Sequence, residues 1–146
     1  MVIGMMGDSC TGKSTIAKIL GKRLDAEVVS GKDYLRLAKN EQMAGVLFRK
    51  KLCNAMAEGN IIYVISEKEQ LSFLPEKAVR ILVTASLDTV KARFAQRMNG
   101  SLPEPVARML EKKYGLFEQE TYHLRIANDE MDAEEACKKI LQLLKQ

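Results

Sequence analysis

The sequence is poor in the residues that hold small disulfide-rich or metal-bound proteins together: it has three cysteines, three prolines, one histidine and no tryptophan. Cys10, Cys53 and Cys137 lie far apart without metal-ligand spacing, so we expect reduced thiols and neither a disulfide framework nor a zinc site. No apolar run approaches the ~18 residues of a membrane span, and the short first run lacks the basic flank and cleavage site of a signal peptide. We therefore expect a soluble, cytoplasmic protein with no membrane partner.

Aromatic residues and net charge are also low, at 5% of the chain and +4 respectively. The basic runs Arg49-Lys50-Lys51 and Lys112-Lys113 have no aromatic residues interleaved to stack on bases. Solvated helix faces explain these runs better, so nucleic acid is not an expected partner. The mild positive charge instead suits a protein with small polyanionic ligands.

The chain has no Pro/Ser/Gly-rich linker and no repeat, and its 146 residues predict one domain spanning 1–146. Apolar, strand-like runs alternate with segments of helical spacing, which predicts an α/β fold with a parallel sheet covered on both faces. The expected strands are 2–6, 27–30, 61–65, 79–84 and 122–127. The expected helices are 13–24, 33 to about 57, 68–74, 87–98, 103–119 and 132–144, the last capped near Asp132. In the second helical region we expect a buried stripe of Met43, Val46, Leu47, Leu52, Met56 and Ala57.

The first strand is followed by a stretch that fits the pattern G-x-x-x-x-G-K-[ST], namely Gly7-Asp8-Ser9-Cys10-Thr11-Gly12-Lys13-Ser14-Thr15. Its place between a strand and a helix is typical of a phosphate-binding loop. In such a loop backbone N–H groups point at phosphate oxygens, and the helix adds the positive end of its dipole. The pattern predicts that Lys13 bridges the β- and γ-phosphates, Ser14 ligates Mg²⁺ and Thr15 reaches the α-phosphate.

Other stretches narrow the class of phosphate-loop protein. The sequence lacks the N-K-x-D and D-x-x-G stretches of GTPases, and motor and transporter ATPases need a longer chain. Ser30-Gly31-Lys32-Asp33-Tyr34-Leu35-Arg36 resembles the S-x-G-D-x-[LF]-R stretch of adenylate and archaeal-type cytidylate kinases. Residues 58–62 resemble their E-G-N-V-V, residues 122–128 resemble their closing Y-D-L-V-I-N-T, and residues 83–88 followed by Arg93 and Arg97 resemble their fourth strand and lid helix.

The resemblance implies a three-layer α/β/α P-loop NTPase fold with a five-stranded parallel sheet in the order 2-3-1-4-5 and a short helical lid over approximately 97–120. It implies ATP and Mg²⁺ as cofactors and a nucleoside monophosphate as acceptor. Arg93 and Arg97 lie on one helix face and would join Lys13 in catalysis. Arg36 would hold the acceptor's phosphate, and Asp33 would take its proton or bond a hydroxyl. The alternatives are a solvated basic face for the arginines and a helix cap for Asp33.

Departures from the family leave the acceptor open. After the third strand the family has an acidic residue and an acceptor-binding arginine, where this chain has Ser66-Glu67, so Glu67 is a candidate indirect partner of Mg²⁺. Arg108 is the one obvious substitute for the family's further lid arginines. His123 replaces an aspartate, and an ordinary surface or packing role is expected of it. A small hydroxylated metabolite is thus the second candidate acceptor, and a nucleotide-binding module without turnover is the third hypothesis. The donor's base and the oligomeric state stay open.

Overall fold

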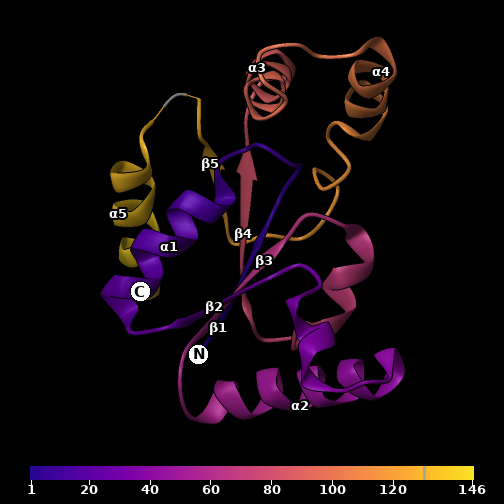
Figure 1. The fold of residues 1–146 in the computed structure, drawn as a ribbon. Coiled ribbons are helices and arrows are strands. Elements are labelled where there is room, and N and C mark those ends of the chain that lie inside the picture. Colours follow the sequence, from indigo (N-terminus) through magenta and orange to yellow (C-terminus); the bar gives the residue numbers. More distant parts are fainter. Residues whose placement is uncertain (130) are drawn as a thin grey trace.

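A parallel sheet forms the middle of the molecule (Figure 1). The computed structural model describes residues 1–129 and 131–146. Within them the sheet has five parallel strands in the order β2-β3-β1-β4-β5. The strands are β1 (Val2–Met6), β2 (Glu27–Ser30), β3 (Ile61–Ile65), β4 (Val79–Thr84) and β5 (Leu124–Ala127). The predicted fold class and strand order are confirmed.

Helices cover both faces of the sheet (Figure 1). On one face α1 (Lys13–Leu24) packs against α5 (Ala133–Leu144), and on the other lies α2 (Glu41–Ala57). The helices α3 (Leu87–Arg97) and α4 (Glu104–Lys113) follow β4, and the 3₁₀ helices η1 (Asp33–Leu37) and η2 (Lys68–Phe73) follow β2 and β3. This is the expected three-layer α/β/α arrangement, with the connections after β1, β3 and β4 gathered at one edge.

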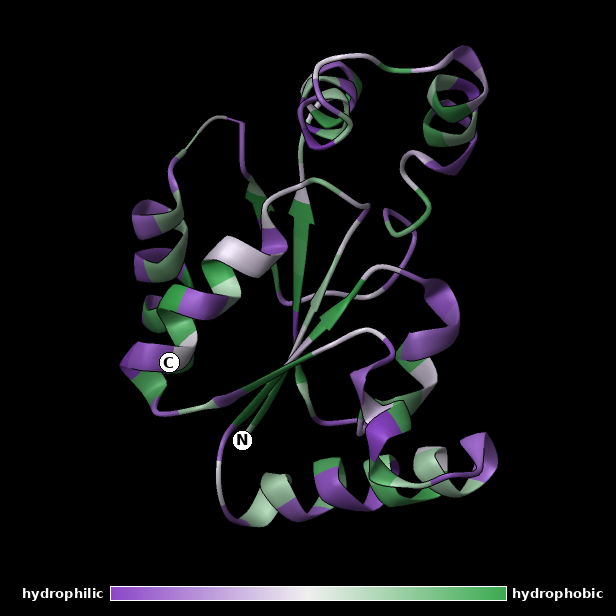
Figure 2. Cartoon of the chain, viewed as in Figure 1, coloured by the Kyte–Doolittle hydropathy of each residue, from purple (hydrophilic) through white to green (hydrophobic). Residues whose placement is uncertain are grey.

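The central strands are apolar along their whole length because both of their faces are covered. Val2 and Met6 of β1 belong to the core cluster on the α2 side, whereas Ile3 and Met5 belong to the cluster under α1 and α5. Figure 2 shows hydrophobic residues along these strands and hydrophilic residues on the outer parts of the helices. The two clusters hold the sheet from both sides and so fix the edge where the loops gather.

The second helical region differs from its prediction. The chain forms η1, becomes extended at Ala38, and starts α2 only after Asn40, whose Oδ1 accepts a hydrogen bond from Met43 N at 3.1 Å. The buried side of α2 consists of Ala44, Phe48, Leu52 and Ala55. The predicted stripe was therefore correct at Leu52, partly so at Met56, and wrong at the exposed residues Met43, Val46, Leu47 and Ala57. The helix is rotated because Phe48 packs into a group of aromatic rings under the sheet.

The end of α4 and the start of β5 also differ from the predicted boundaries. α4 ends at Lys113 rather than at 119, because Tyr114 has an extended backbone (φ −62°, ψ 132°) and Gly115 follows in the left-handed region (φ 79°). The fifth strand begins at Leu124 rather than at 122. His123 instead bonds the start of β4: its N–H donates to Arg80 O at 2.8 Å, and its Nδ1 accepts from Arg80 N at 3.0 Å. His123 is exposed and serves to join the chain before β5 to the start of β4, an ordinary structural role of the kind expected of it.

The structure also bears on the expectations about membrane spans and cysteines. None of the helices in the described residues combines the length and the apolar character that a membrane crossing requires. Cys10, Cys53 and Cys137 are all free thiols, and Cys10 and Cys137 are buried.

Candidate functional site

The phosphate-binding loop runs from the end of β1 to the start of α1, and neighbouring chain packs tightly on both of its framing glycines. A Cβ on Gly7 would lie 2.2 Å from Val83 O of β4. A Cβ on Gly12, whose φ is +91°, would lie 2.0 Å from Asn128 Nδ2. Asn128 also donates from Nδ2 to Thr11 O at 2.7 Å. The backbone oxygen of Val83 leaves no room for a side chain at Gly7, and the positive φ of Gly12 strains any other residue, so both positions favour glycine as the loop pattern requires.

Lys13 is folded back on its own loop. Its side chain is buried, and Nζ donates to Gly7 O at 2.7 Å and to Asp8 O at 2.6 Å. Thr11 Oγ1 donates to the same Asp8 carbonyl at 3.0 Å. The ammonium is thus held at the loop where the pattern predicts a phosphate, and binding of a phosphate would exchange neutral carbonyl acceptors for charged oxygens.

The surroundings of Lys13 weaken its charged form. Burial lowers the pKa of the ammonium to about 8, the Asp8 carboxylate opposes this shift, and the nearby Arg97 guanidinium adds to it. A bound phosphate favours the ammonium and raises this pKa again. Above pH 8, binding must therefore take up a proton, so affinity is coupled to pH.

We predict that the affinity for ADP is nearly constant between pH 7 and about 8 and then falls by up to about tenfold per pH unit. Calorimetric titrations up to about pH 9.5, in buffers of different ionisation enthalpy, measure both the affinity and the proton uptake. Lys13→Arg is the control, because its guanidinium keeps its charge throughout this range. An affinity for the unmodified protein that stays constant across the whole range would contradict the prediction.

Asp8, a variable position of the pattern, links the loop to the segment after α4. Its Oδ2 accepts a hydrogen bond from Gly115 N at 2.7 Å, and burial raises the pKa of its carboxyl. Tyr114, the residue before Gly115, makes a second link: its hydroxyl donates to Ala85 O at 2.7 Å. The loop pattern includes Asp8, but nothing in the pattern predicts this link. An acidic residue in a phosphate-binding loop was a sign that the carboxylate has a structural partner, but that partner lies 107 residues away in the sequence.

We expect Asp8→Ala to lower the free energy of unfolding by about 2 kcal/mol, because a hydrogen bond to a charged group is lost and Gly115 N is left without an acceptor. Asp8→Asn keeps an acceptor oxygen and should retain most of this stability. Urea unfolding measures the stability, and hydrogen exchange at the Gly115 amide reports the bond directly. Equal exchange rates at that amide in the unmodified protein and Asp8→Ala would contradict the assignment.

Three cavities meet at the loop. The large cavity, of about 660 Å³, lies between the loop, α3 and the start of α5, and its lining includes Gly12, Thr15, Gln96 and Asn128. The loop cavity, of about 110 Å³, is lined by Ser9, Cys10, Gly12, Lys13, Ser14, Thr15, Ser66 and Arg97. The α3–α4 cavity, of about 130 Å³, lies between the loop, the end of β3 and these two helices. Cys10, Gly12, Thr15 and Arg97 line both of the first two cavities, and Ser9 and Ser66 line both of the last two.

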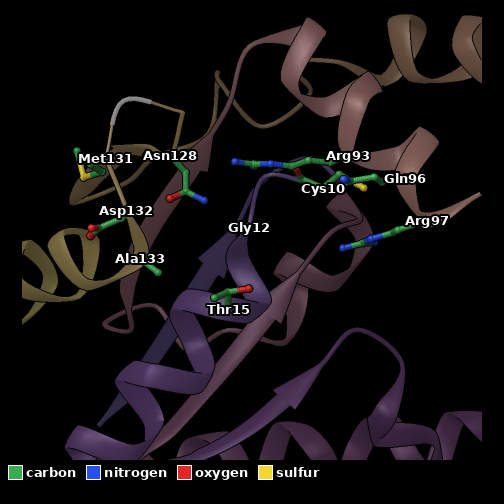
Figure 3. A pocket seen from close by; sticks show the side chains of 10 residues that line it. All are labelled: Cys10, Gly12, Thr15, Arg93, Gln96, Arg97, Asn128, Met131, Asp132 and Ala133. Carbon is green, nitrogen blue, oxygen red and sulfur yellow. Dashed lines mark hydrogen bonds between the residues drawn. The ribbon is translucent and has the colours of Figure 1, made fainter. Parts of the chain in front are cut away.

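The two predicted arginines of α3 lie at this junction. Figure 3 shows Arg93 and Arg97 extending from α3 toward the large cavity, with Asn128 and Asp132 on its other side. Arg93 Nη1 donates to Cys10 O at 3.1 Å, while Arg97 also lines the loop cavity. Both guanidinium groups therefore stand beside the loop rather than on a remote basic face. Gln96, Asn128, Met131 and Asp132 also line the large cavity, and none of them was predicted as a site residue. Asp132 was expected only as the cap of the last helix, and its Oδ1 does accept a hydrogen bond from Glu135 N at 2.8 Å.

Most of the other residues singled out from the sequence lie away from the three cavities. Asp33 Oδ2 accepts from Ser30 N at 3.2 Å, so its carboxylate holds the turn before η1, and Arg36 is exposed on η1. Neither residue lines the three cavities. Arg108 pairs with Glu104 in an exposed contact on α4. Glu67 lines the α3–α4 cavity and forms a capping box with Gln70 at the start of η2.

The loop can be tested for its fit to Mg²⁺. In residues 1–129 and 131–146, no group of three or more His, Cys, Asp or Glu side chains could hold a metal by itself. The loop cavity instead offers the hydroxyls of Ser9, Ser14 and Ser66. Mg²⁺ prefers oxygen ligands, keeps several waters and commonly binds together with substrate phosphates. These residues fit an ion that arrives with a nucleotide, with Ser14 as its predicted ligand.

Comparisons with known proteins bear on the fold. No protein-family model matches the sequence, and a search of curated proteins finds no match. Among solved structures, an uncharacterized protein from Eubacterium ventriosum matches with a TM-score of 0.74 and 17% identity, over 100% of this chain and 99% of that one.

Two kinases match similarly. A sugar kinase from a Janibacter species has a TM-score of 0.70 and 15% identity, over 99% of this chain and 94% of its own. Shikimate kinase from Acinetobacter baumannii, in complex with shikimate, has a TM-score of 0.69 and 18% identity, over 98% of this chain and 92% of its own. The chain shares the fold of P-loop kinases. At these identities the likeness concerns the fold alone, and it does not single out adenylate or cytidylate kinases.

Proposed function

We propose that the protein is an ATP-dependent kinase that transfers the γ-phosphoryl group to a small acceptor. The observation that carries this proposal is that the loop cavity shares lining residues with both the large cavity and the α3–α4 cavity. A nucleoside in the large cavity would direct its phosphates along the loop toward Lys13. An acceptor in the α3–α4 cavity would then approach the last phosphate from the opposite side, which suits in-line transfer.

The residues around the loop would supply the positive charge that transfer requires. Lys13 would leave the loop carbonyls for the β- and γ-phosphates, while Arg93 and Arg97 would contact phosphate oxygens from α3. Mg²⁺ held through Ser14 would add charge at those oxygens. Residues from 97 to about 120, including α4, would act as the lid that excludes water from the reacting groups.

Two acceptor classes remain in the proposal. The resemblance in the sequence favours a nucleoside monophosphate such as CMP. A specific observation favours a hydroxylated acceptor: the described residues that line the α3–α4 cavity include no arginine for an acceptor phosphate, whereas they include two carboxylates. The sugar kinase and the shikimate kinase that share the fold are named for hydroxyl-bearing acceptors, which supports the same alternative.

An ADP-release assay tests the proposal. The acceptor panel contains CMP, UMP, AMP, dCMP and dTMP beside polyols, amino alcohols and hydroxy acids, each with ATP and Mg²⁺. Turnover that an acceptor stimulates is expected. Tight ATP binding in calorimetry with no acceptor-stimulated turnover would instead favour the nucleotide-binding module and would contradict the kinase proposal.

A further inference from the structure

The walls of the α3–α4 cavity are fixed by hydrogen bonds on two sides. The bond from Gly115 N to Asp8 and the bond from the Tyr114 hydroxyl to Ala85 O, each 2.7 Å, hold the segment after α4 against the loop. On the opposite side, the buried Gln70 accepts from Ser66 N at 3.2 Å and from Glu67 N at 3.3 Å through its Oε1. The first two bonds join parts of the chain that are far apart in sequence, whereas the Gln70 bonds are local and fix the turn after β3. The cavity is therefore a built feature of the fold and not a gap under a loose helix.

One wall of the cavity is apolar. Val90 and Phe94 come from α3, Met109 and Leu110 from α4, and Leu116 from the segment that follows. Val90 and Leu110 are buried in a core cluster that Phe94 packs against, so this wall rests on the protein's interior. A wall of this kind receives the carbon skeleton of a ligand and disfavours one that is charged on all sides.

The charged residues of the cavity do not suit a phosphate-bearing acceptor. Asp8 and Glu67 contribute two carboxylates, and Lys113 contributes the one ammonium of the lining. The guanidinium of Arg97 and the ammonium of Lys13 line the loop cavity, where the donor's phosphates are expected. The excess of carboxylates repels an anionic acceptor and attracts hydroxyl or ammonium donors. A nucleoside monophosphate would bring its doubly charged phosphate to a cavity whose described lining has a single positive side chain.

We propose that the α3–α4 cavity seats the acceptor and that the acceptor is a small alcohol without a negative group, either a neutral alcohol or an amino alcohol. This inference rests on the proposed kinase function and specifies its acceptor. Glu67 stands at the end of β3, beside Ser66, which lines both the loop cavity and the α3–α4 cavity. Within the described residues Glu67 belongs to no ion pair. The capping box with Gln70 engages one acceptor position of its carboxylate, and the other oxygen can accept from a substrate hydroxyl.

The step balances without a further reactant. The acceptor's hydroxyl oxygen forms a bond to the γ-phosphorus, and the bond from that phosphorus to the β–γ bridging oxygen breaks. The electron pair of the broken bond leaves with ADP. The hydroxyl proton passes to the Glu67 carboxylate and from there to water. A phosphate oxygen of a nucleoside monophosphate needs no such base, so a role for Glu67 in turnover distinguishes the two acceptor classes.

The acceptor panel with the unmodified protein is the first test. We expect ADP release to be stimulated by neutral or amino alcohols and not by hydroxy acids or nucleoside monophosphates. Stimulation by either anionic class alone would overturn this inference and leave the kinase function standing. If no acceptor stimulates turnover while ATP still binds, the kinase function itself fails.

Two variants test the place of the acceptor. Met109→Trp should fill the cavity from its exposed rim and raise the KM for the acceptor at least about tenfold, with the KM for ATP unchanged. Lys112→Trp adds the same bulk to an exposed neighbour on α4 that does not line the cavity, and it should behave like the unmodified protein. An unchanged acceptor KM in Met109→Trp would overturn the assignment of the site.

Glu67→Gln tests the proton transfer, because glutamine keeps an oxygen for the helix cap but cannot take the proton. We expect kcat to fall about 10²-fold with the KM for ATP unchanged. Glu69→Gln, an exposed residue of the same helix η2, is the matched control and should keep both kcat and KM. An unchanged kcat in Glu67→Gln would overturn the role of Glu67.

Discussion

Replacement of Lys13 by methionine should lower kcat/KM for the acceptor by ~10³-fold or more, the loss typical of a group that stabilises developing charge in a water-poor site. The structure gives two reasons for so large an effect. Lys13 is the one buried cation of the described loop, and its ammonium already sits among the main-chain atoms that would surround a phosphate. No other side chain of the loop can bring a positive charge to that point.

The effect on stability should be much smaller than the effect on turnover. Lys13→Met removes the lysine donor from Gly7 O and leaves Asp8 O with the Thr11 hydroxyl alone, which costs energy, but it also removes the cost of burying an ammonium. These terms oppose each other, so we expect the free energy of unfolding to change by less than about 2 kcal/mol. Lys18→Met, on the exposed side of the same helix, is the control and should keep both properties. ATP-dependent activity that survived in Lys13→Met would show that the site is assigned wrongly.

The sequence predicted those parts of the site that depend on neighbouring residues. A phosphate-binding loop needs glycines, a lysine and a hydroxyl at fixed spacing between a strand and a helix, so Gly7, Gly12, Lys13 and Ser14 could be placed by pattern alone. The central strands β1 and β3 were equally clear, because burial on both faces demands unbroken apolar runs. The place of Arg93 and Arg97 beside the loop was expected from the resemblance to the lid helix of nucleotide kinases.

The parts that depend on distant contacts were missed or misplaced. The α3–α4 cavity needs the bond between Asp8 and Gly115, and no spacing rule connects residues so far apart. Asp33 and Arg36 follow a strand of the sheet, yet Asp33 serves its own turn and Arg36 is exposed on η1. Their role at the acceptor remains a prediction from resemblance. A local motif specifies the backbone around it, whereas a substrate cavity is shaped by elements that meet only in the fold.

The orientation of α2 is the clearest example of a feature that depends on distant contacts. The spacing of its apolar residues allows more than one face to be buried. Val46, Leu47 and Met43 form one such face, but Phe48 decides the outcome since it is the largest apolar side chain of the helix. It lies 4.8 Å from Tyr63 and 5.2 Å from Phe73 between ring centroids in edge-on contacts, and it stacks on Tyr34 at 5.4 Å. Tyr63 belongs to β3, so these contacts fix the helix to the sheet.

Phe48→Ala should therefore lower the free energy of unfolding by about 3–5 kcal/mol, because it removes a buried ring and leaves a cavity beneath β3. Val46 lies two residues earlier and is 57% exposed. Val46→Ala should therefore change the free energy of unfolding by no more than about 0.5 kcal/mol. Urea unfolding of both variants, followed by circular dichroism, measures the difference. A larger loss in Val46→Ala than in Phe48→Ala would mean that α2 faces the sheet with the stripe first expected from its sequence. The two substitutions thus decide the orientation of the helix by energy alone.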